Sequence, residues 1–404
     1  MYHCNISLIK TLMKLILHIG TAKTGTTTLQ HWFASNRESL RAQGIYYPKS
    51  LGKVNHRKLS VFAMNRAISD RYSHQNKISS VEDYQNFKSN STQDFEQEYA
   101  ENSDIKTWVI SNEHLHSRLT KIEMVKQVKQ FLSDKFEEIE VLVHLRPQVD
   151  LAVSLASTAI RAGKAVNYRW FSKQKESDYY YNYNQLIEKW ETIFSDKNIT
   201  ILPFKINSCM TSFLIHKLDI ETNNLMPIYR KNEAIDWRTM AVFNIILESQ
   251  ENKKEWQKYK KFINNLPCTE KLSIGLDMAQ EFQSQFKASN SRLIHRRQEL
   301  NSDDLTPDWN KYDVPANLHY LDHLVFTEPL NALVMGLNWE IKLEKCNTKL
   351  AECEAALAQN QLKKARLFLE KAKKIVSQLP EDERIGRRLQ QLKKRIEPLA
   401  KEVQ

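Results

Sequence analysis

The sequence predicts an α/β protein built around a parallel β-sheet, and three observations indicate this fold class. Short apolar runs recur along the first half of the chain, segments with helical spacing follow or precede them, and a glycine-rich loop follows the first run. Continuous apolar runs are typical of parallel strands that are buried on both faces. Because strands that alternate with helices form a parallel sheet covered on both sides, we expect a three-layer fold.

Each predicted element follows from its local pattern. Three of the four apolar runs are led or filled by β-branched residues, which favour strands. The predicted strands are Leu15–Gly20, Trp108–Ser111, Val141–Leu145 and Ile199–Phe204. Helical periodicity predicts helices over Thr26–Gln43, Ile122–Phe131, Gln148–Ala162 and Tyr183–Phe194.

The segments between and after these elements are more polar. Residues 50–105 are irregular in pattern, with a low-complexity patch near Ser89–Gln97, and we interpret them as an insertion over one edge of the sheet. Residues 165–182 are aromatic and basic, which suits a lid or substrate loop. The pattern is helical from about 232 to 287, and residues 301–340 suit an irregular closing segment.

The last sixty residues change character, and we place a domain boundary before them. The α/β domain is expected over residues 14–340, after an N-terminal extension over 1–13, and residues 345–404 are expected to be helical. Small, large and small residues recur at helical spacing in this tail, at Ala365, Leu369 and Ala372. They resemble one tetratricopeptide-type unit, and a plain helical hairpin fits equally well. Because a single unit cannot bury both its faces, we expect it to pack on the main domain, on a protein partner or on a second copy.

Composition restricts the class of protein. Of the 404 residues, 41% are apolar and 26% are charged, as in a soluble globular protein. No apolar stretch reaches the roughly 20 residues that a membrane-spanning helix needs. The five cysteines are irregularly spaced and form no CxxC pair, which argues against a disulfide scaffold or a zinc site and favours a reducing, cytoplasmic location. Cys346 and Cys353 are seven residues apart on one face of a predicted helix, which indicates packing residues.

The chain is basic, with a net charge of +11. The residues after 344 contain 15 Lys and Arg against 8 Asp and Glu, so much of the excess belongs to the tail. The charge fits either a solvated basic tail or the attraction of an anionic cofactor or substrate. No recognised motif for nucleic-acid binding is present, and no nucleic-acid partner is expected.

The loop after the first strand carries the clearest functional signal. Residues 20–27 read GTAKTGTT and stand between a predicted strand and a predicted helix. The amides of such a loop and of the helix N-terminus form a ready anion site. In the Walker-A loop, GxxxxGK[ST], lysine directly follows the second glycine. Here Lys23 precedes Gly25 and Thr26 stands in the lysine's place, so the loop fails as an ATP or GTP loop.

At these residues the chain resembles the sulfotransferases that use 3′-phosphoadenosine 5′-phosphosulfate (PAPS). The stretch KTGTT resembles their 5′-phosphosulfate loop, and HIGTAKTGTTTLQ resembles the bacterial carbohydrate-type branch of the family. A second motif, VLVHLRPQVDLAVSLAS, resembles the family's 3′-phosphate element, which is a strand ending in an arginine and a helix with a serine eight residues on. These two residues are Arg146 and Ser154. The resemblance covers about residues 14–205 and implies a P-loop-like fold.

The resemblance also implies a cofactor site and a reaction. A sulfuryl group would pass in line from PAPS to a hydroxyl or amine of an acceptor and leave 3′,5′-ADP, with no metal required. Lys23 would stabilise the charge that develops on the bridging oxygen, and Arg146 and Ser154 would hold the 3′-phosphate. The implied cofactor-binding residues are Ala22, Lys23, Thr24, Gly25, Thr26, Thr27, Arg146 and Ser154.

A general base should face the sulfate across the acceptor. The resemblance points to the stretch WVISNEHLHSR after the second predicted strand, where Glu113 is the first candidate and His114 the second. A Glu-His pair at a strand end also fits a hydrogen-bonded corner without a catalytic role. His56, in VNHRKLS, resembles a histidine near the acceptor site of bacterial relatives, and a surface histidine is the alternative.

Two rival functions stay open at this point. A P-loop kinase or nucleotide hydrolase would need the Walker lysine and an aspartate for Mg²⁺, and a non-catalytic adaptor would act through its helical tail. The residue patterns do not identify the acceptor of the sulfuryl group, and the resemblance implies a carbohydrate or a glycolipid headgroup. Aromatic residues that could stack on a sugar are Trp170, Phe171 and Tyr179–Tyr181. Basic residues that could replace the family's nucleotide-closing segment are Arg292, Arg296 and Arg297.

Overall fold

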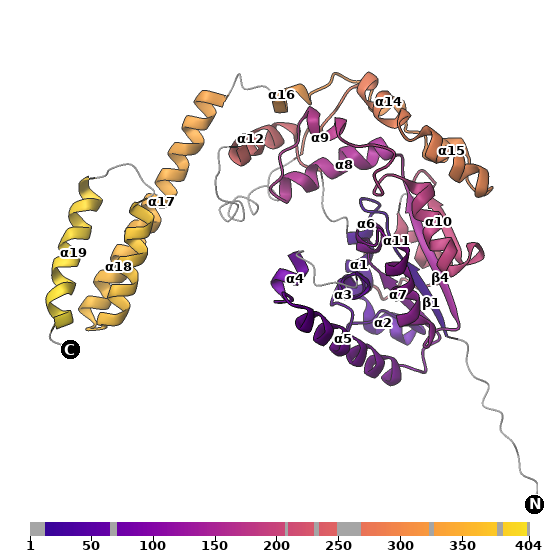
Figure 1. The fold of residues 1–404 in the computed structure, drawn as a ribbon, viewed down its shortest axis with the longest axis horizontal. Helices are drawn as coiled ribbons and strands as arrows, with labels where there is room; N and C mark the ends of the chain where they lie inside the picture. The colour runs from indigo at the N-terminus through magenta and orange to yellow at the C-terminus, as the bar shows by residue number, and fades with distance from the viewer. Residues whose placement is uncertain are drawn as a thin grey trace, which may run out of the picture. The chain divides into compact units, whose positions relative to one another are not determined.

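A computed structural model describes most of the chain (Figure 1). The described residues are 13–64, 71–206, 209–229, 234–248, 268–322, 327–377 and 383–401. The chain forms two compact units, which we call the α/β unit and the helical unit. The α/β unit comprises Met1–Met240 and Glu255–Asp322, and the helical unit comprises Ala241–Lys254 and His323–Gln404. The predicted N-terminal extension lies outside the described residues, apart from Met13.

The α/β unit is built on a five-stranded, wholly parallel sheet with the strand order β2-β3-β1-β4-β5. The strands are β1 (Lys14–His18), β2 (Ile45–Tyr46), β3 (Thr107–Ser111), β4 (Glu138–Leu145) and β5 (Ile199–Pro203). The predicted α/β class, its parallel sheet and its four strands are therefore confirmed. The short edge strand β2 was not predicted, because two residues are too few to show a period.

Helices cover both faces of this sheet. One face presents the apolar side chains of Ile16, Val109 and Leu142 to α1 (Thr26–Ser35) and α11 (Met210–Lys217). On the opposite face, Trp108 of β3 contacts the rings of Phe95 and Phe136, with ring centroids 6.0 and 5.6 Å apart. Helix α10 (Tyr183–Phe194) packs on β4, β5 and α7 (Ile122–Ser133). The result is the expected three-layer arrangement.

The predicted helices are confirmed with one difference. Helices α7, α8 (Gln148–Arg161) and α10 begin at the predicted residues. The segment predicted as one helix over Thr26–Gln43 forms two, α1 and α2 (Arg37–Ala42), which are separated at Asn36. The side-chain amide of Asn36 donates a hydrogen bond to the carbonyl of Trp32 and its carbonyl oxygen accepts one from Met226 N–H, so Asn36 caps the first helix and ties it to a distant segment.

The interpretation of residues 50–105 as irregular is wrong for most of its length. This segment contains α3 (Arg57–Ala63), α4 (Arg71–Gln75) and α5 (Val81–Glu101). Ser80 and Asp83 form a capping box that satisfies the first amides of α5. Polar residues occupy most of α5 because only a narrow stripe of it is buried, at Tyr84, Ser91 and Phe95. A stripe this narrow gives a weak periodic signal in the sequence.

Shorter helices complete the α/β unit, and one crosses into the helical unit. They are α6 (His114–Arg118), α9 (Tyr168–Ser172), α12 (Trp237–Glu248), α14 (Leu276–Ser284), α15 (Lys287–Arg296) and α16 (His319–Asp322), with 3₁₀ turns at Asp196–Asn198, Ser302–Leu305 and Trp309–Lys311. Within the described ranges, no helix is both long and apolar enough to cross a bilayer.

The helical unit contains a long helix, α17 (Thr327–Ala358), followed by α18 (Leu362–Val376) and α19 (Glu383–Lys401). Three helices therefore fill the region predicted as a hairpin, and α17 crosses the predicted boundary near residue 345 without interruption. Ala365, Leu369 and Ala372 lie in the core of this unit, as their spacing predicts. Cys346 and Cys353 are also buried there, which confirms their predicted packing role. The likeness to a tetratricopeptide unit stays a prediction, and Pro380, between α18 and α19, lies outside the described residues.

Candidate active site

The glycine-rich loop joins β1 to α1 at the carboxyl edge of the sheet. Gly20 has a φ of 106°, and a Cβ atom there would lie 3.2 Å from the Cα of Glu113. Gly25 has a φ of 88° and caps the N-terminus of α1. Lys23 also has a left-handed backbone, with a φ of 64°. Non-glycine residues are held in this conformation at a cost of roughly 1–3 kcal/mol. Lys23 shares it with Lys77, Ser195, Asp219 and Asn360, so the backbone conformation by itself does not mark a functional residue.

Strand β4 holds the loop in place. Both the backbone N–H and the hydroxyl of Thr21 donate to the carbonyl of His144, each at 2.9 Å, and His144 N–H donates to the carbonyl of Gly20 at 2.6 Å. The Thr24 hydroxyl donates to the carbonyl of Thr21 at 2.7 Å, so this side chain stabilises the loop itself. Arg146 Nη1 donates to the carbonyl of Lys23 at 2.9 Å. The loop and the end of β4 therefore form one connected structure.

Positive charge is concentrated at this junction. Burial, together with the charges of Arg161 and Arg146, lowers the pKa of Lys23 to about 8. Among the described residues, no carboxylate lies within ion-pair distance of Lys23. The Arg146 guanidinium lies over the ring of Phe204, 4.8 Å from its centroid, and its buried Nε has no hydrogen-bond partner in the described part of the chain. A bound anion would offset the repulsion among these cations and raise the pKa of Lys23.

A cavity of about 660 Å³ opens beside these cations, wholly within the α/β unit. Its lining comes from the loop, from the residues that directly follow β4 and β5, from α8 and from three segments later in the chain. The residues are Lys23, Arg146, Asp150, Val153, Ser154, Ser157, Phe204, Ala234, Ile235, Lys271, Leu272, Lys311 and Tyr312. The structure thus brings together Lys23, Arg146 and Ser154, as the two motifs require. Their carboxyl-edge position in a parallel sheet is where such folds bind ligands.

Asp150 organises the far side of the cavity. Its side chain is 9% exposed and accepts a hydrogen bond from the Tyr312 hydroxyl at 2.6 Å. The same carboxylate lies 3.7 Å from Arg146 and 4.0 Å from Lys311. It therefore links Arg146 to the segment around 311. Asp150 was not among the predicted site residues, although its position four residues after Arg146, near the start of α8, could have indicated it.

Lys271 and Lys311 add two further cations to the cavity. Neither lysine was among the predicted site residues. No local pattern marks them, because they lie more than a hundred residues after Arg146 and reach the cavity only through the fold.

The remaining loop residues predicted to bind the cofactor form the turn itself. Thr26 and Thr27 begin α1, where the first amides of a helix lack acceptors within the helix. Thr26 is buried, Thr27 and Ala22 are half-buried, and Gly25 is exposed. Of the predicted loop residues, Lys23 alone is part of the cavity lining.

Glu113 lies two residues after β3, beside the loop. Its Oε2 accepts a hydrogen bond from Gln30 Nε2 at 2.6 Å, and Gln30 also reaches the hydroxyl of Ser111 at 3.3 Å. His114 Nε2 lies 3.9 Å from Glu113 Oε1, and both side chains keep part of their surface exposed, 31% and 18% respectively. Neither residue lines the 660 Å³ cavity, but Glu113 packs against Gly20 of the loop. A partly exposed carboxylate held by a buried amide can accept a proton from a group that reaches it.

His56 is fully buried, so the alternative of a surface histidine is wrong. Its Nδ1 accepts from Ser111 N–H at 2.9 Å and its Nε2 donates to the carbonyl of Pro48 at 2.9 Å. The Asn112 side chain donates to the His56 carbonyl at 2.8 Å. Because both ring nitrogens are engaged, the geometry favours a role in fixing the end of β3, next to Glu113, over proton transfer.

Comparison with known proteins gives limited similarity. No family model matches the chain, and no curated protein matches it. Among solved structures, the chain is similar to a sulfotransferase from Alicyclobacillus acidocaldarius, at 13% sequence identity and a TM-score of 0.33, over 61% of this chain and 98% of that chain. These values do not place the chain in a family, so the functional assignment rests on the residues of the site.

The aromatic segment predicted as a lid is largely packed into the α/β unit. Phe171 of α9 and Tyr181 are both buried. Their rings contact Phe282 and Phe286, with centroids 6.3 Å apart for Phe171–Phe282 and 5.5 Å for Tyr181–Phe286. These rings therefore belong to the core. Two aromatic residues of α9 keep access to solvent: Trp170 is half-buried and Tyr168 is exposed.

The arginines considered as a nucleotide-closing segment are engaged elsewhere. Arg292 pairs with Glu176, and Arg296 and Arg297 both pair with Glu191. None of the three lines the cavity. Lys271 and Lys311 occupy the cavity wall instead.

Among the described residues, no group of three or more His, Cys, Asp or Glu side chains is placed to hold a metal ion.

Lowering the pH from 7 to 5 is expected to weaken the α/β unit. Burial lowers the pKa of His18 to about 3, of His56 to about 3 and of His116 to about 4. These histidines stay neutral in the folded protein, whereas in the unfolded chain they take up protons below about pH 6.5. Each therefore lowers the free energy of unfolding by at most about 1.4 kcal/mol per pH unit between about 6.5 and 4. Urea unfolding at several pH values, followed by tryptophan fluorescence, measures this slope.

Variants with one histidine removed test the cause. The free energy of unfolding of His18→Gln should depend less steeply on pH than that of the wild type. His216→Gln, at an exposed position, should keep the wild-type slope. An equal slope in all three proteins would contradict the assignment to buried histidines.

Proposed function

We propose that this protein is a PAPS-dependent sulfotransferase that moves a sulfuryl group to a hydroxyl or amine of an acceptor. One observation carries the proposal: Lys23, Arg146 and Ser154 meet in a single cavity at the carboxyl edge of the sheet. Lys23 precedes the second glycine of the loop, and no carboxylate of the described residues neutralises it. This arrangement suits an anionic ligand that is not bound through a Walker lysine.

The cations of the cavity, together with the adjoining start of α1, supply donors for both ends of such a ligand. PAPS is anionic at its 5′-phosphosulfate and at its 3′-phosphate, and it supplies the sulfuryl group when bound. Lys23 and the first amides of α1 would hold the 5′ end. Arg146, with its unpartnered Nε, and Ser154 would hold the 3′-phosphate, with Lys271 and Lys311 adding positive charge nearby. The donor set therefore fits the ligand.

In the proposed mechanism, Lys23 donates a hydrogen bond to the oxygen on which negative charge develops as the sulfur–oxygen bond breaks. Glu113 accepts the proton of the acceptor hydroxyl as the new sulfur–oxygen bond forms. Gln30 holds the Glu113 carboxylate through its 2.6 Å hydrogen bond. His114 is the second candidate for the base and His56 the third, since its ring nitrogens are already engaged. By its resemblance to the carbohydrate-type branch, the chain is proposed to act on a carbohydrate or glycolipid headgroup.

The cofactor assignment predicts that 3′,5′-ADP binds more tightly than 5′-AMP. An additional charge-assisted contact with a phosphate contributes about 1.5–3 kcal/mol, so we expect a difference of about 10–100-fold in Kd. Isothermal titration calorimetry measures both affinities, and a thermal-shift series with ATP–Mg²⁺ and GTP–Mg²⁺ tests the kinase or hydrolase alternative. Equal affinities for the two adenine nucleotides would remove the assigned roles of Arg146 and Ser154.

Two arginine variants, one inside the cavity and one outside it, provide the test of the site and its control. Arg146→Gln should bring the affinity for 3′,5′-ADP close to that for 5′-AMP. Arg169→Gln, at an exposed position outside the cavity, should leave both affinities unchanged. A preference that survives Arg146→Gln would place the 3′-phosphate elsewhere.

A further inference from the structure

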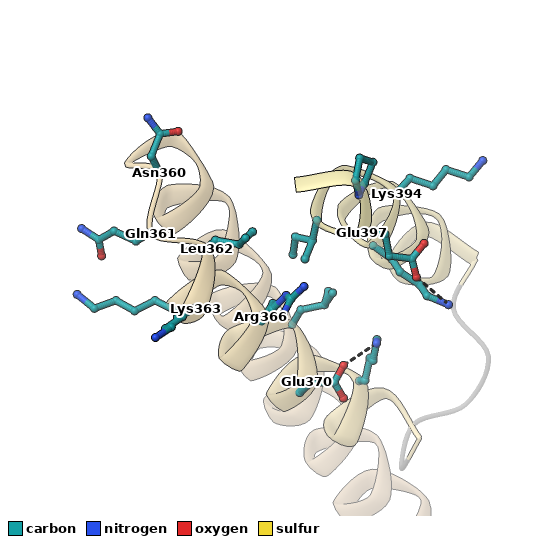
Figure 2. Close-up of a pocket in the computed structure, with 14 residues that line it drawn as sticks. Asn360, Gln361, Leu362, Lys363, Arg366, Glu370, Lys394 and Glu397 are labelled. Carbon is teal, nitrogen blue, oxygen red and sulfur yellow. Dashed lines mark hydrogen bonds and ion pairs between the residues drawn. The ribbon is translucent and has the colours of Figure 1, made fainter. Parts of the chain in front are cut away.

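The helical unit contains a groove of about 1520 Å³ between α18 and α19 (Figure 2). Its walls come from the turn before α18, from α18 itself and from the second half of α19. The lining residues are Asn360, Gln361, Leu362, Lys363, Lys364, Arg366, Leu369, Glu370, Lys373, Lys393, Lys394, Ile396, Glu397 and Pro398. The groove belongs to the helical unit alone and takes no part in the proposed sulfuryl transfer.

Apolar side chains form part of the groove, and the helices that carry them are held together by the core and by an ion pair. Leu369 and Ile396 line the groove and are also members of the buried core of the helical unit, 3% and 4% exposed. Leu362 is half-buried at the start of α18 and points towards α19 in Figure 2. Arg388 ties α19 to α17 through two hydrogen bonds of 2.9 Å to the carboxylate of Glu354. Leu369 and Ile396 are packed into the core and close the base of the groove, so the apolar floor that an occupant can touch is formed by the half-buried Leu362 and the exposed Pro398.

The rim of the groove is strongly basic. It carries six Lys and Arg side chains against two glutamates. Glu370 pairs with Lys373 at 2.6 Å and Glu397 with Lys393 at 3.5 Å, as the dashed lines in Figure 2 show. The other four cations have no carboxylate partner among the described residues, and these are Lys363, Lys364, Arg366 and Lys394. An occupant with negative charge would complement them.

We propose that this groove binds an acidic amphipathic helix of a partner protein. A helix of about 10 Å diameter and about 13 residues occupies roughly 1500 Å³, which matches the size of the groove. One face of such a helix would cover Leu362 and Pro398, and acidic residues on its flanks would meet the four unpaired cations. A concave site with an apolar floor suits a helix better than a flat lipid surface, and the apolar floor offers no partner to a nucleic-acid backbone.

Charge also argues against occupants from this chain. The residues after 344 are themselves basic, so a second copy would bring like charge to the groove. Residues 249–267 carry five lysines against two glutamates and would do the same. A different, acidic polypeptide is the occupant that the observed charges favour.

The test uses the full-length protein and a fluorescein-labelled synthetic peptide of 18 residues, with leucine at every third or fourth position and glutamate on the flanks. Fluorescence anisotropy should show saturable binding that weakens by about tenfold or more between 50 and 500 mM salt, because charge attraction is screened. A scrambled peptide of the same composition should bind at least about tenfold more weakly. No binding of the amphipathic peptide, or equal binding of the scrambled one, would overturn the proposal.

Two triple variants locate the site. Lys363→Gln/Lys364→Gln/Lys394→Gln should weaken peptide binding about tenfold or more. Removal of the same charge outside the groove, in Lys371→Gln/Lys374→Gln/Arg395→Gln, should change it less than about twofold. All six positions are exposed, and circular dichroism confirms that both variants are folded. Equal losses of peptide affinity in the two variants would overturn the proposal. A second contrary result would be that single-stranded DNA or anionic vesicles bind more tightly than the peptide, and that this binding is lost in the groove variant alone.

Discussion

Replacing Glu113 by glutamine is expected to lower turnover by about 100–10,000-fold, which is the range that a general base supplies. Glutamine keeps an oxygen that can accept the hydrogen bond from Gln30 Nε2, so the local structure should be preserved. It cannot take up the acceptor proton at neutral pH. The affinity for 3′,5′-ADP should stay nearly unchanged, because Glu113 does not line the cavity that holds Lys23 and Arg146.

The measurement is the release of 3′,5′-ADP from PAPS with an acceptor found from a panel of sugars and phenols, together with calorimetric titration of 3′,5′-ADP. His114→Ala and His56→Ala are the comparison variants. His56→Ala should lower stability more than turnover, since it leaves Ser111 N–H and the Pro48 carbonyl without their partner. If Glu113→Gln keeps nearly full turnover while His114→Ala is inactive, the base is His114.

Replacing Lys23 by alanine is expected to lower turnover by about 100–1000-fold, or about 3–4 kcal/mol of transition-state stabilisation. Arg146 lies 3.7 Å from Asp150, but no carboxylate of the described residues pairs with Lys23 itself, so the charge of Lys23 is available to the leaving oxygen. A matched control exists in Lys77, which is exposed and also has a left-handed backbone, with a φ of 56°. Lys77→Ala carries the same change of backbone preference and should leave turnover unchanged.

Measuring the affinity for 3′,5′-ADP at several pH values separates the effect of the Lys23 charge from the effect of its side-chain volume. Burial and the charges of Arg161 and Arg146 lower the pKa of Lys23 to about 8 in the free protein. The protonated lysine binds an anion, so wild-type affinity for 3′,5′-ADP should fall as the pH rises above about 8. Lys23→Ala should lose this dependence. The same pH profile in both proteins would show that Lys23 does not contact the nucleotide.

The hydrogen bonds around β3 explain why a base at this position would be well oriented. Gln30 from α1 reaches both Glu113 and Ser111, and Ser111 Oγ lies 2.8 Å from His18 Nδ1. His56 holds the backbone of Ser111 from the other side. Side chains from β1, from α1 and from the start of α3 therefore fix the end of β3, two residues before Glu113. Such support restricts the carboxylate to a narrow range of positions, as catalysis by a general base requires.

Local sequence patterns predicted much of the α/β unit. Val141–Leu145 and Ile199–Phe204 are continuous apolar runs, and each forms a buried parallel strand. Helix α10 spans Tyr183–Phe194 as predicted, because its apolar spacing and its N-terminal Asn182 cap act over a few residues. The glycine-rich loop was also readable, since Gly20 and Gly25 both adopt backbone conformations that favour glycine.

Patterns with a weak local signal were misread. Helix α5 buries only three side chains along 21 residues, so its polar sequence resembles an irregular insertion. Phe171 and Tyr181 looked like substrate-binding aromatics because nothing in their own segment shows that Phe282 and Phe286 pack on them. The surroundings of a side chain are set by elements that the local sequence does not contain.

The sequence by itself determined the parallel α/β fold and the two motifs with Lys23 and Arg146, because strand propensity, helical periodicity and glycine-dependent turns act within a few residues. Only the tertiary structure decided that Lys271 and Lys311 complete the cavity around Asp150, and that His56 is buried with both nitrogens bonded. These contacts join segments far apart in the chain. They form when the sheet and its helices pack, and packing depends on side chains from every layer at once.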